Sequence, residues 1–176
     1  MEKLAKSSSI NLGLYLSLTL VLLILAAYAI NLDLLAGGLY GIFLFVLIIV
    51  FGIISVVKAK KISGGFLSFK HSFTAYFITV SLGILASILI YYILFNFIDP
   101  EAAEVLKEKT IEATARNMQR FGADEDAISQ TMNSMEDQNS YSIPSLLIGA
   151  VFQLAIYSII GLIVAAFMKK NPEKDY

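Results

Sequence analysis

The chain has 176 residues, of which 57% are hydrophobic and 15% are charged, and it contains one His and no Cys. A soluble domain is typically about 45–50% apolar and about 25% charged, so much of the apolar surface of this chain must face lipid. This composition excludes a cytosolic enzyme, a secreted disulfide scaffold, thiolate or His-rich metal sites and a disordered regulator, and we expect no cofactor and no nucleic-acid partner.

Four stretches are long and apolar enough to form membrane-spanning helices, which need about 20 mostly apolar residues. Continuous apolar runs such as residues 42–51 lack the polar alternation of a barrel strand, so these stretches are expected to be helical. The sequence therefore predicts an all-α membrane protein that forms one four-span domain over residues 1–176. The predicted spans are residues 12–32, 38–57, 72–98 and 144–168.

The first span admits a second interpretation. Lys3 and Lys6 precede an apolar run that ends in Ala27-Tyr28-Ala29, which imitates the cleavage site of a signal peptide. The apolar run of about 20 residues is longer than a usual signal core, which favours a retained span. Cleavage would leave three spans in the same orientation, so the distribution of charge does not decide between the two.

The distribution of charge predicts the orientation. In a four-pass layout, nine of the 13 Lys and Arg residues fall on one side of the membrane, and eleven of the 14 Asp and Glu residues fall on the other. By the positive-inside rule both termini are cytoplasmic and residues 99–142 lie outside. The nine lysines are Lys3, Lys6, Lys58, Lys60, Lys61, Lys70, Lys169, Lys170 and Lys174.

The cytoplasmic link between the second and third spans combines lysines with phenylalanines. Phe66, Phe69, Phe73 and Phe77 have the spacing of one helical face, and His71 lies among them. The pattern predicts a positively charged anchor with an aromatic stripe at the membrane surface, since lysines near anionic headgroups contribute about 1 kcal/mol each. The alternative is a docking surface for a cytoplasmic partner or an anionic lipid. Its candidate contacts are Lys58, Lys60, Lys61, Phe69 and His71.

The segment of residues 99–142 is polar and favours helix. Asp99 is a suitable N-cap and Pro100 a suitable first helical residue, while Gly122 is a plausible terminator. A second, shorter helix is expected from about Asp124. We therefore predict a short acidic helical hairpin between the third and fourth spans, capping the four-helix bundle on its outer side. Its acidic residues lack the alternation and the turn glycine of a calcium loop, so a solvated acidic face is expected.

The spans contain no ionisable residue near their middle. Proton-coupled transporters, pumps and voltage sensors usually carry such groups, so their absence argues against these classes. The spans also lack paired aspartates, a Ser/His pair and an HExxH motif, and therefore no catalytic residues and no enzymatic activity are expected.

Small residues recur in the spans at four-residue intervals, which lets helix backbones approach closely. Gln153 and Tyr157 lie in one such ladder, and Gln153, as the most polar residue deep in a span, is expected to face protein. The ladders are interpreted as packing among the four helices, with self-association or a partner surface as the alternative. The glycines expected at helix contacts are Gly37, Gly41, Gly83, Gly149 and Gly161.

The chain resembles a family of bacterial four-span membrane proteins catalogued as domain of unknown function family 4199. The resemblance rests on the motif at residues 64–69, the motif at residues 96–100, the charged helix that follows it, the fourth span with its glycines, and the closing Lys169-Lys170. It implies an inner-membrane protein of gram-negative bacteria. The family has no established activity, so the resemblance assigns no functional residues.

We expect a non-enzymatic accessory or scaffold subunit of a membrane complex, whose partners are membrane lipids and another membrane protein or a second copy of the chain. The first alternative is a carrier or flippase helper for a lipid-linked substrate. This carrier predicts a polar groove between the third and fourth spans, lined by Thr79, Ser87, Gln153, Tyr157 and Ser158. The second alternative is an oligomeric pore, in which these polar side chains converge on a symmetry axis.

Overall fold

A computed structural model describes residues 2–170, and over these residues the chain is helical with no β-strand. The charged residues Glu173, Lys174 and Asp175, which contribute to the charge distribution discussed above, lie outside the described residues. In chain order the elements are α1 (Glu2–Ile30), α2 (Leu32–Ala36), α3 (Gly38–Ile62), α4 (Phe69–Ile93), the π-helix η1 (Leu94–Ile98), α5 (Pro100–Arg120), α6 (Glu125–Glu136) and α7 (Ile143–Met168).

Four helical segments within residues 2–170 are long and apolar enough to cross a membrane, which confirms the prediction of an all-α, multi-pass membrane protein. The first three segments extend further than predicted at the end that carries lysines, because a helix continues past its apolar part into the polar residues at the membrane surface; the first segment also ends at Ile30 rather than at residue 32. The four segments are Lys3–Ile30, Gly38–Ile62, Phe69–Ile98 and Ile143–Met168.

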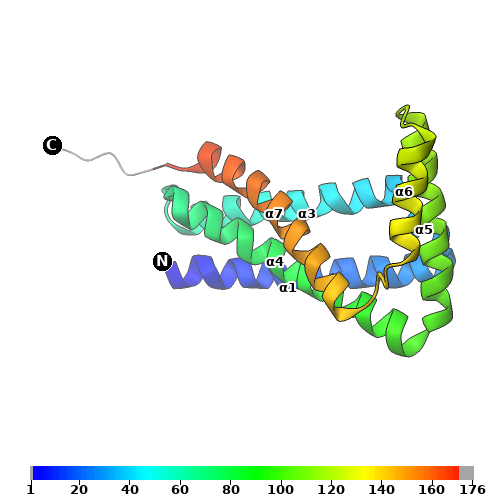
Figure 1. Cartoon of the computed structure of the whole chain (residues 1–176). Coiled ribbons are helices and arrows are strands. Elements are labelled where there is room, and N and C mark those ends of the chain that lie inside the picture. The colour runs from blue at the N-terminus through cyan, green and yellow to red at the C-terminus, as the bar shows by residue number, and fades with distance from the viewer. Residues whose placement is uncertain (1, 171–176) are drawn as a thin grey trace.

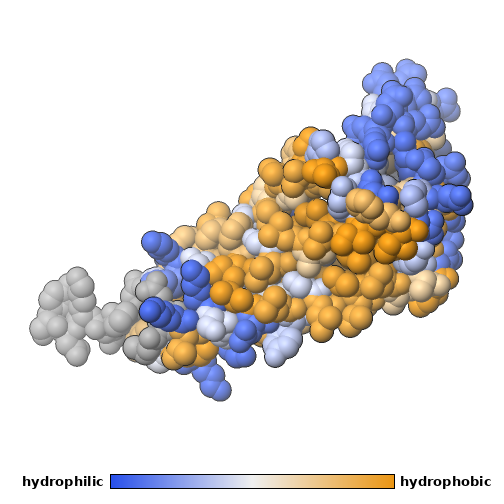
Figure 2. Space-filling model, turned by 90° about the horizontal axis from the view of Figure 1, so that it is seen from below, coloured by the Kyte–Doolittle hydropathy of each residue, from blue (hydrophilic) through white to orange (hydrophobic). Residues whose placement is uncertain are grey.

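The four long helices run side by side, and α4 contacts each of α1, α3 and α7 (Figure 1). The beginning of α1, the α3–α4 turn and the end of α7 lie together at one end, which we call the lysine-rich end. At the opposite end α5 and α6 contact each other and lie across the long helices. Figure 2 shows an apolar band over the long helices, with polar residues gathered at both ends.

Tyr76 of α4 is fully buried at the centre of the helix packing. Glycines on two neighbouring helices make room for its ring, namely Gly52 of α3 and Gly161 of α7. A Cβ at Gly161 would lie 2.6 Å from Cδ1 of Tyr76, and one at Gly52 would also overlap the ring. The glycines therefore let α3 and α7 approach α4 closely.

Hydroxyl groups join α1, α3 and α4 near the lysine-rich end. Thr79 is fully buried, and its Oγ1 lies 2.9 Å from the carbonyl oxygen of Ser9 and 2.8 Å from Oγ of Ser55. The Ser55 hydroxyl donates in turn to the carbonyl oxygen of Ala75 at 3.0 Å. Because polar atoms in an apolar interior are costly unless they are paired, this network fixes how the three helices fit together.

At the end opposite the lysine-rich end, which we call the polar end, two carboxylates hold the helices together. Asp99 caps α5 by accepting a hydrogen bond from the N–H of Ala102 at 3.0 Å, and it accepts a second from the hydroxyl of Tyr28 at 2.6 Å. Asp33 of α2 forms an ion pair with Lys109 of α5. These contacts fasten α5 to α1 and α2, and α5 begins at Pro100 as the sequence predicts.

Leucine in place of the contact glycines is expected to destabilise the fold. A Cβ at Gly83 would lie 2.6 Å from Cδ2 of Leu16, so Gly83→Leu and Gly161→Leu overpack their interfaces, at a cost of about 1–3 kcal/mol each. The thermal unfolding midpoint in detergent should therefore fall. Gly149→Leu is the matched control, because a Cβ there meets nothing within 4 Å. Equal midpoints for all three variants would contradict this account of the packing.

Acid is expected to loosen α5 from the long helices. The hydrogen bond from Tyr28, followed by that from the Ala102 N–H, lowers the pKa of Asp99, and the bonds from Lys109 and then Asn31 lower the pKa of Asp33. A carboxyl group whose pKa is lowered in the folded state stabilises the fold at pH values above its ordinary pKa of about 4. This stabilisation is lost as the pH falls below that value and the carboxylate is protonated.

Two cysteines introduced into this Cys-free chain, at Leu39 and Gln119, allow the distance between α3 and α5 to be measured with spin labels. We expect one narrow distance distribution at pH 7 and a broad one below about pH 4. Asp99→Ala should broaden the distribution already at pH 7, whereas Glu108→Gln, which changes an exposed acid on the same helix, should not. A distribution that stays narrow in acid would refute the role of the two carboxylates.

Candidate functional site

A groove of about 610 Å³ runs along the long helices on the side where α3 and α7 diverge. All four long helices contribute to it, and its walls are mostly apolar, with Leu20 and Ile24 from α1 and Leu44 and Ile48 from α3. At the polar end the groove reaches Ser140, in the segment before α7. A groove of this size and composition is suited to a long apolar ligand rather than to a small polar one.

Polar side chains line the groove at a depth that is otherwise apolar. Ser87 of α4 and both Gln153 and Tyr157 of α7 belong to its walls. Tyr157 is 2% exposed, its ring centroid lies 5.2 Å from that of Phe45, and it follows Gln153 by one helical turn on α7. Gln153 is itself exposed toward the groove. The groove therefore offers the amide of Gln153 to a ligand that lies within it, while the Ser87 hydroxyl already donates to the carbonyl oxygen of Gly83 at 3.0 Å.

Three of the five polar residues proposed for a carrier groove thus come together, namely Ser87, Gln153 and Tyr157. Thr79 instead belongs to the buried hydroxyl network, and Ser158 does not line the groove. Sequence reasoning missed the contribution of α3, where Phe45 forms part of the wall. An unbroken apolar run such as that of α3 shows which residues avoid water, but it does not show which of them face lipid, protein or a groove.

The five glycines expected at helix contacts fall into three environments. Gly83 and Gly161 lie against Leu16 and Tyr76, respectively, where an added Cβ would overlap the neighbouring side chain. Gly41 and Gly149 line the groove from opposite walls, and an added Cβ at either one meets nothing within 4 Å. Gly37 lies in the turn between α2 and α3.

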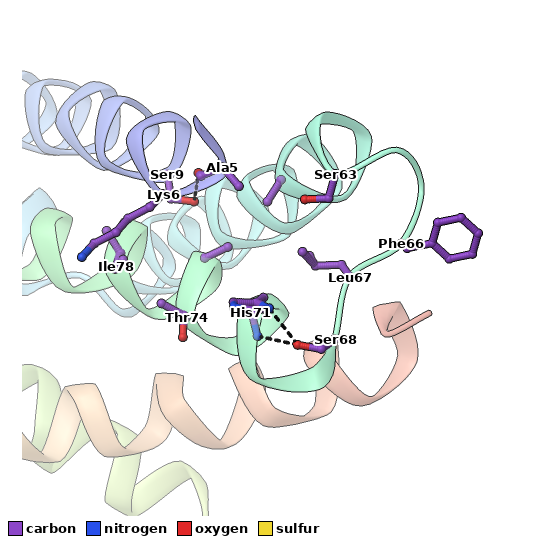
Figure 3. Close-up of a pocket in the computed structure, with 12 residues that line it drawn as sticks. Ala5, Lys6, Ser9, Ser63, Phe66, Leu67, Ser68, His71, Thr74 and Ile78 are labelled. Atoms are coloured by element: carbon purple, nitrogen blue, oxygen red, sulfur yellow. Dashed lines mark hydrogen bonds between the residues drawn. The ribbon is translucent and has the colours of Figure 1, made fainter. Parts of the chain in front are cut away.

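A second hollow, of about 260 Å³, lies at the lysine-rich end and is shown in Figure 3. The first turns of α1, the end of α3 and the beginning of α4 surround it. His71 is one of its lining residues, and its Nδ1 lies 2.9 Å from Oγ of Ser68, the N-cap of α4. We call this hollow the lysine-end pocket, because Lys6 of α1 also lines it.

The remaining candidates of the α3–α4 link differ in their surroundings. Lys58, Lys61 and Phe69 are exposed and line neither hollow. Lys60 is half-buried, and its Nζ donates to the carbonyl oxygen of Met168 at 2.9 Å, so this lysine fastens the end of α7 to α3. A cation at the C-terminus of a helix also interacts favourably with the helix dipole.

A backbone bridge that the sequence did not predict holds the same region together. Leu67 and Lys170 exchange two hydrogen bonds, with N–O distances of 2.8 and 2.9 Å, and Nζ of Lys170 lies 5.5 Å from the ring centroid of Phe66. Gly64 and Gly65 precede this bridge with φ values of +71° and +89°, which other residues rarely adopt. The glycine pair indicates a turn in the sequence, but no sequence pattern indicated that Leu67, after this turn, pairs with Lys170.

Within residues 2–170, no group of three His, Cys, Asp or Glu side chains is arranged to hold a metal ion. The model of one protein family, described as Protein of unknown function (DUF4199), matches residues 11–170. Neither a curated protein nor a solved structure matches the chain.

Proposed function

The chain belongs to this family, DUF4199, and we propose that it is a non-enzymatic protein of the bacterial inner membrane that carries, or helps to flip, a lipid-linked substrate. The observation that carries this proposal is the groove of about 610 Å³ with Ser87, Gln153 and Tyr157 in its walls. Ligand sites typically have volumes of about 300–1,000 Å³, with mostly apolar walls and a few polar groups. The groove has these properties and lies along helices that are long enough to span the membrane.

The polar groups favour a substrate with a polar head over a plain acyl chain. An amide has two N–H donors and one acceptor oxygen, and the neighbouring Tyr157 can satisfy only part of this capacity in Gln153. Polar groups in the membrane are costly without partners, so Gln153 is best explained by a ligand whose polar part reaches this depth. A lipid-linked substrate that moves along the groove would bring such a group past Gln153.

An accessory subunit is the second candidate, and Gly41 and Gly149 are the observation that favours it. Both glycines lie on the groove without a neighbour, and a helix of another membrane protein could pack closely against them. Gly83 and Gly161 are not available for such a partner, because contacts within the chain occupy them. A pore formed by several copies has less support, since Thr79 is buried and cannot face a shared axis.

The proposed orientation places the lysine-rich end in the cytoplasm. The beginning of α1, the α3–α4 turn and the end of α7 lie there (Figure 1), whereas the acidic residues from Asp33 to Asp137 lie toward the other end. The positive-inside rule then puts both termini inside. In this orientation α5 and α6 form an acidic hairpin that covers the outer end of the four-span domain.

Reporter fusions test this orientation. A reporter that is active only outside the inner membrane should be silent when fused after Lys170 and active when inserted at Gly122, in the turn between α5 and α6. A reporter that works only in the cytoplasm should give the reverse pattern. An active periplasmic reporter after Lys170 would contradict the orientation.

Retention of a lipid in mild detergent tests the groove. We expect the purified chain to keep one lipid-linked species, visible by mass spectrometry, and Gly149→Phe to lose it because the added ring fills the groove. Ala155→Phe adds the same ring to an exposed position of α7 outside the groove and should retain the lipid. Gln153→Leu should weaken retention by removing the polar contact while keeping the volume similar.

The same purification separates the two candidates. A stoichiometric protein partner that is lost in Gly149→Phe, in place of a retained lipid, would replace the carrier with the accessory subunit. Equal lipid retention in Gly149→Phe and Ala155→Phe would refute a ligand in the groove.

A further inference from the structure

The lysine-end pocket lies at the boundary between membrane and water. Three of its lining residues lie in the first turns of α1 and two lie at the end of α3, while the other seven lie in the α3–α4 turn and the beginning of α4. Each of these segments lies where a membrane-spanning helix begins or ends. The pocket is separate from the groove, because the two share no lining residue.

The chemistry of the pocket is that of an anion site. Lys6 supplies a positive charge, and Ser63 brings a hydroxyl group to the walls (Figure 3). The hydroxyls of Ser68 and Thr74 also line the pocket, but they are already bonded to His71 and to the carbonyl oxygen of Lys70, respectively. None of its lining residues is acidic. Exposed lysines surround it at the same end, among them Lys58, so the local potential favours a negatively charged ligand.

The apolar walls indicate that the anion belongs to a lipid. Leu67, Ala75 and Ile78 form much of the remaining surface, which an inorganic anion would not need. The volume of about 260 Å³ is below the range of sites that enclose a whole ligand, about 300–1,000 Å³. It corresponds to roughly nine water molecules, which is enough for a phosphate and the glycerol attached to it. The acyl chains would then extend into the surrounding membrane.

We propose that the lysine-end pocket binds the phosphate headgroup of an anionic phospholipid. Lys6 donates to the phosphate, the Ser63 hydroxyl donates a second hydrogen bond, and the apolar walls contact the glycerol and the first methylene groups. The bound headgroup lies between α1, α3 and α4 and joins the three helices at the end where the hydroxyl network also joins them.

Titration of the delipidated full chain in neutral detergent tests this site. Phosphatidylglycerol should raise the thermal unfolding midpoint in a saturable way, whereas phosphatidylcholine with the same acyl chains should not. Lys6→Gln should weaken the affinity for phosphatidylglycerol by about tenfold, because a hydrogen bond to a charged group is lost. Lys3→Gln removes the same charge from an exposed position of α1 outside the pocket and should have much less effect.

A second variant is a control for a nonspecific effect of charge on lipid binding. Ser63→Phe fills the pocket without changing any charge, and it should abolish the response to phosphatidylglycerol while the midpoint without lipid stays similar. Three results would overturn the proposal: an equal response to phosphatidylcholine, equal losses in Lys6→Gln and Lys3→Gln, or saturation of the site by inorganic phosphate at matched ionic strength.

Discussion

The ring of Tyr76 determines how closely the long helices of this protein can approach one another. It is fully buried in the first third of α4, and Gly52 and Gly161, which have no side chain, leave space for it on both sides. In a membrane, helices gain little from burying apolar surface because lipid is equally apolar, so close packing and hydrogen bonds must hold them together. On α4, the ring of Tyr76 between its two glycines provides the close packing, and the hydroxyl of Thr79 provides the hydrogen bonds.

The groove follows from this central position of α4. The closest glycine contacts lie between α4 and its neighbours, and α3 and α7 are held by α4 more than by each other. Where they diverge, Gly41 and Gly149 find no neighbour. The same residue type thus has opposite effects on one helix. At Gly161 the ring of Tyr76 fills the space that the glycine leaves, whereas at Gly149, three turns earlier, no side chain fills it and a hollow remains.

This contrast explains how much could be predicted. The four spans and the cap at Asp99 follow from local properties of the sequence, namely apolar length and capping chemistry, and the structure has them. The ladder containing Gln153 and Tyr157 indicated that these residues share a face, and they do line one groove. What that face meets depends on the placement of α3, which no local pattern encodes. For the same reason Lys60 looked like a lipid or partner contact, whereas it binds the end of α7.

The two ends of the molecule fix the helices by different means, and this difference bears on how the groove could work. At the lysine-rich end the bonds from Lys60 and the Leu67–Lys170 bridge hold α7 to its neighbours. At the polar end the long helices are held to α5 through two carboxylates, while the groove reaches Ser140 between α6 and α7. The segment around Ser140 is itself fastened to η1, because Nδ2 of Asn96 donates to the carbonyl oxygen of Tyr141 at 2.9 Å and the ring centroids of Tyr141 and Phe95 lie 4.6 Å apart. A ligand that used this end of the groove would therefore have to displace these contacts, whereas the packing around Tyr76 would stay intact.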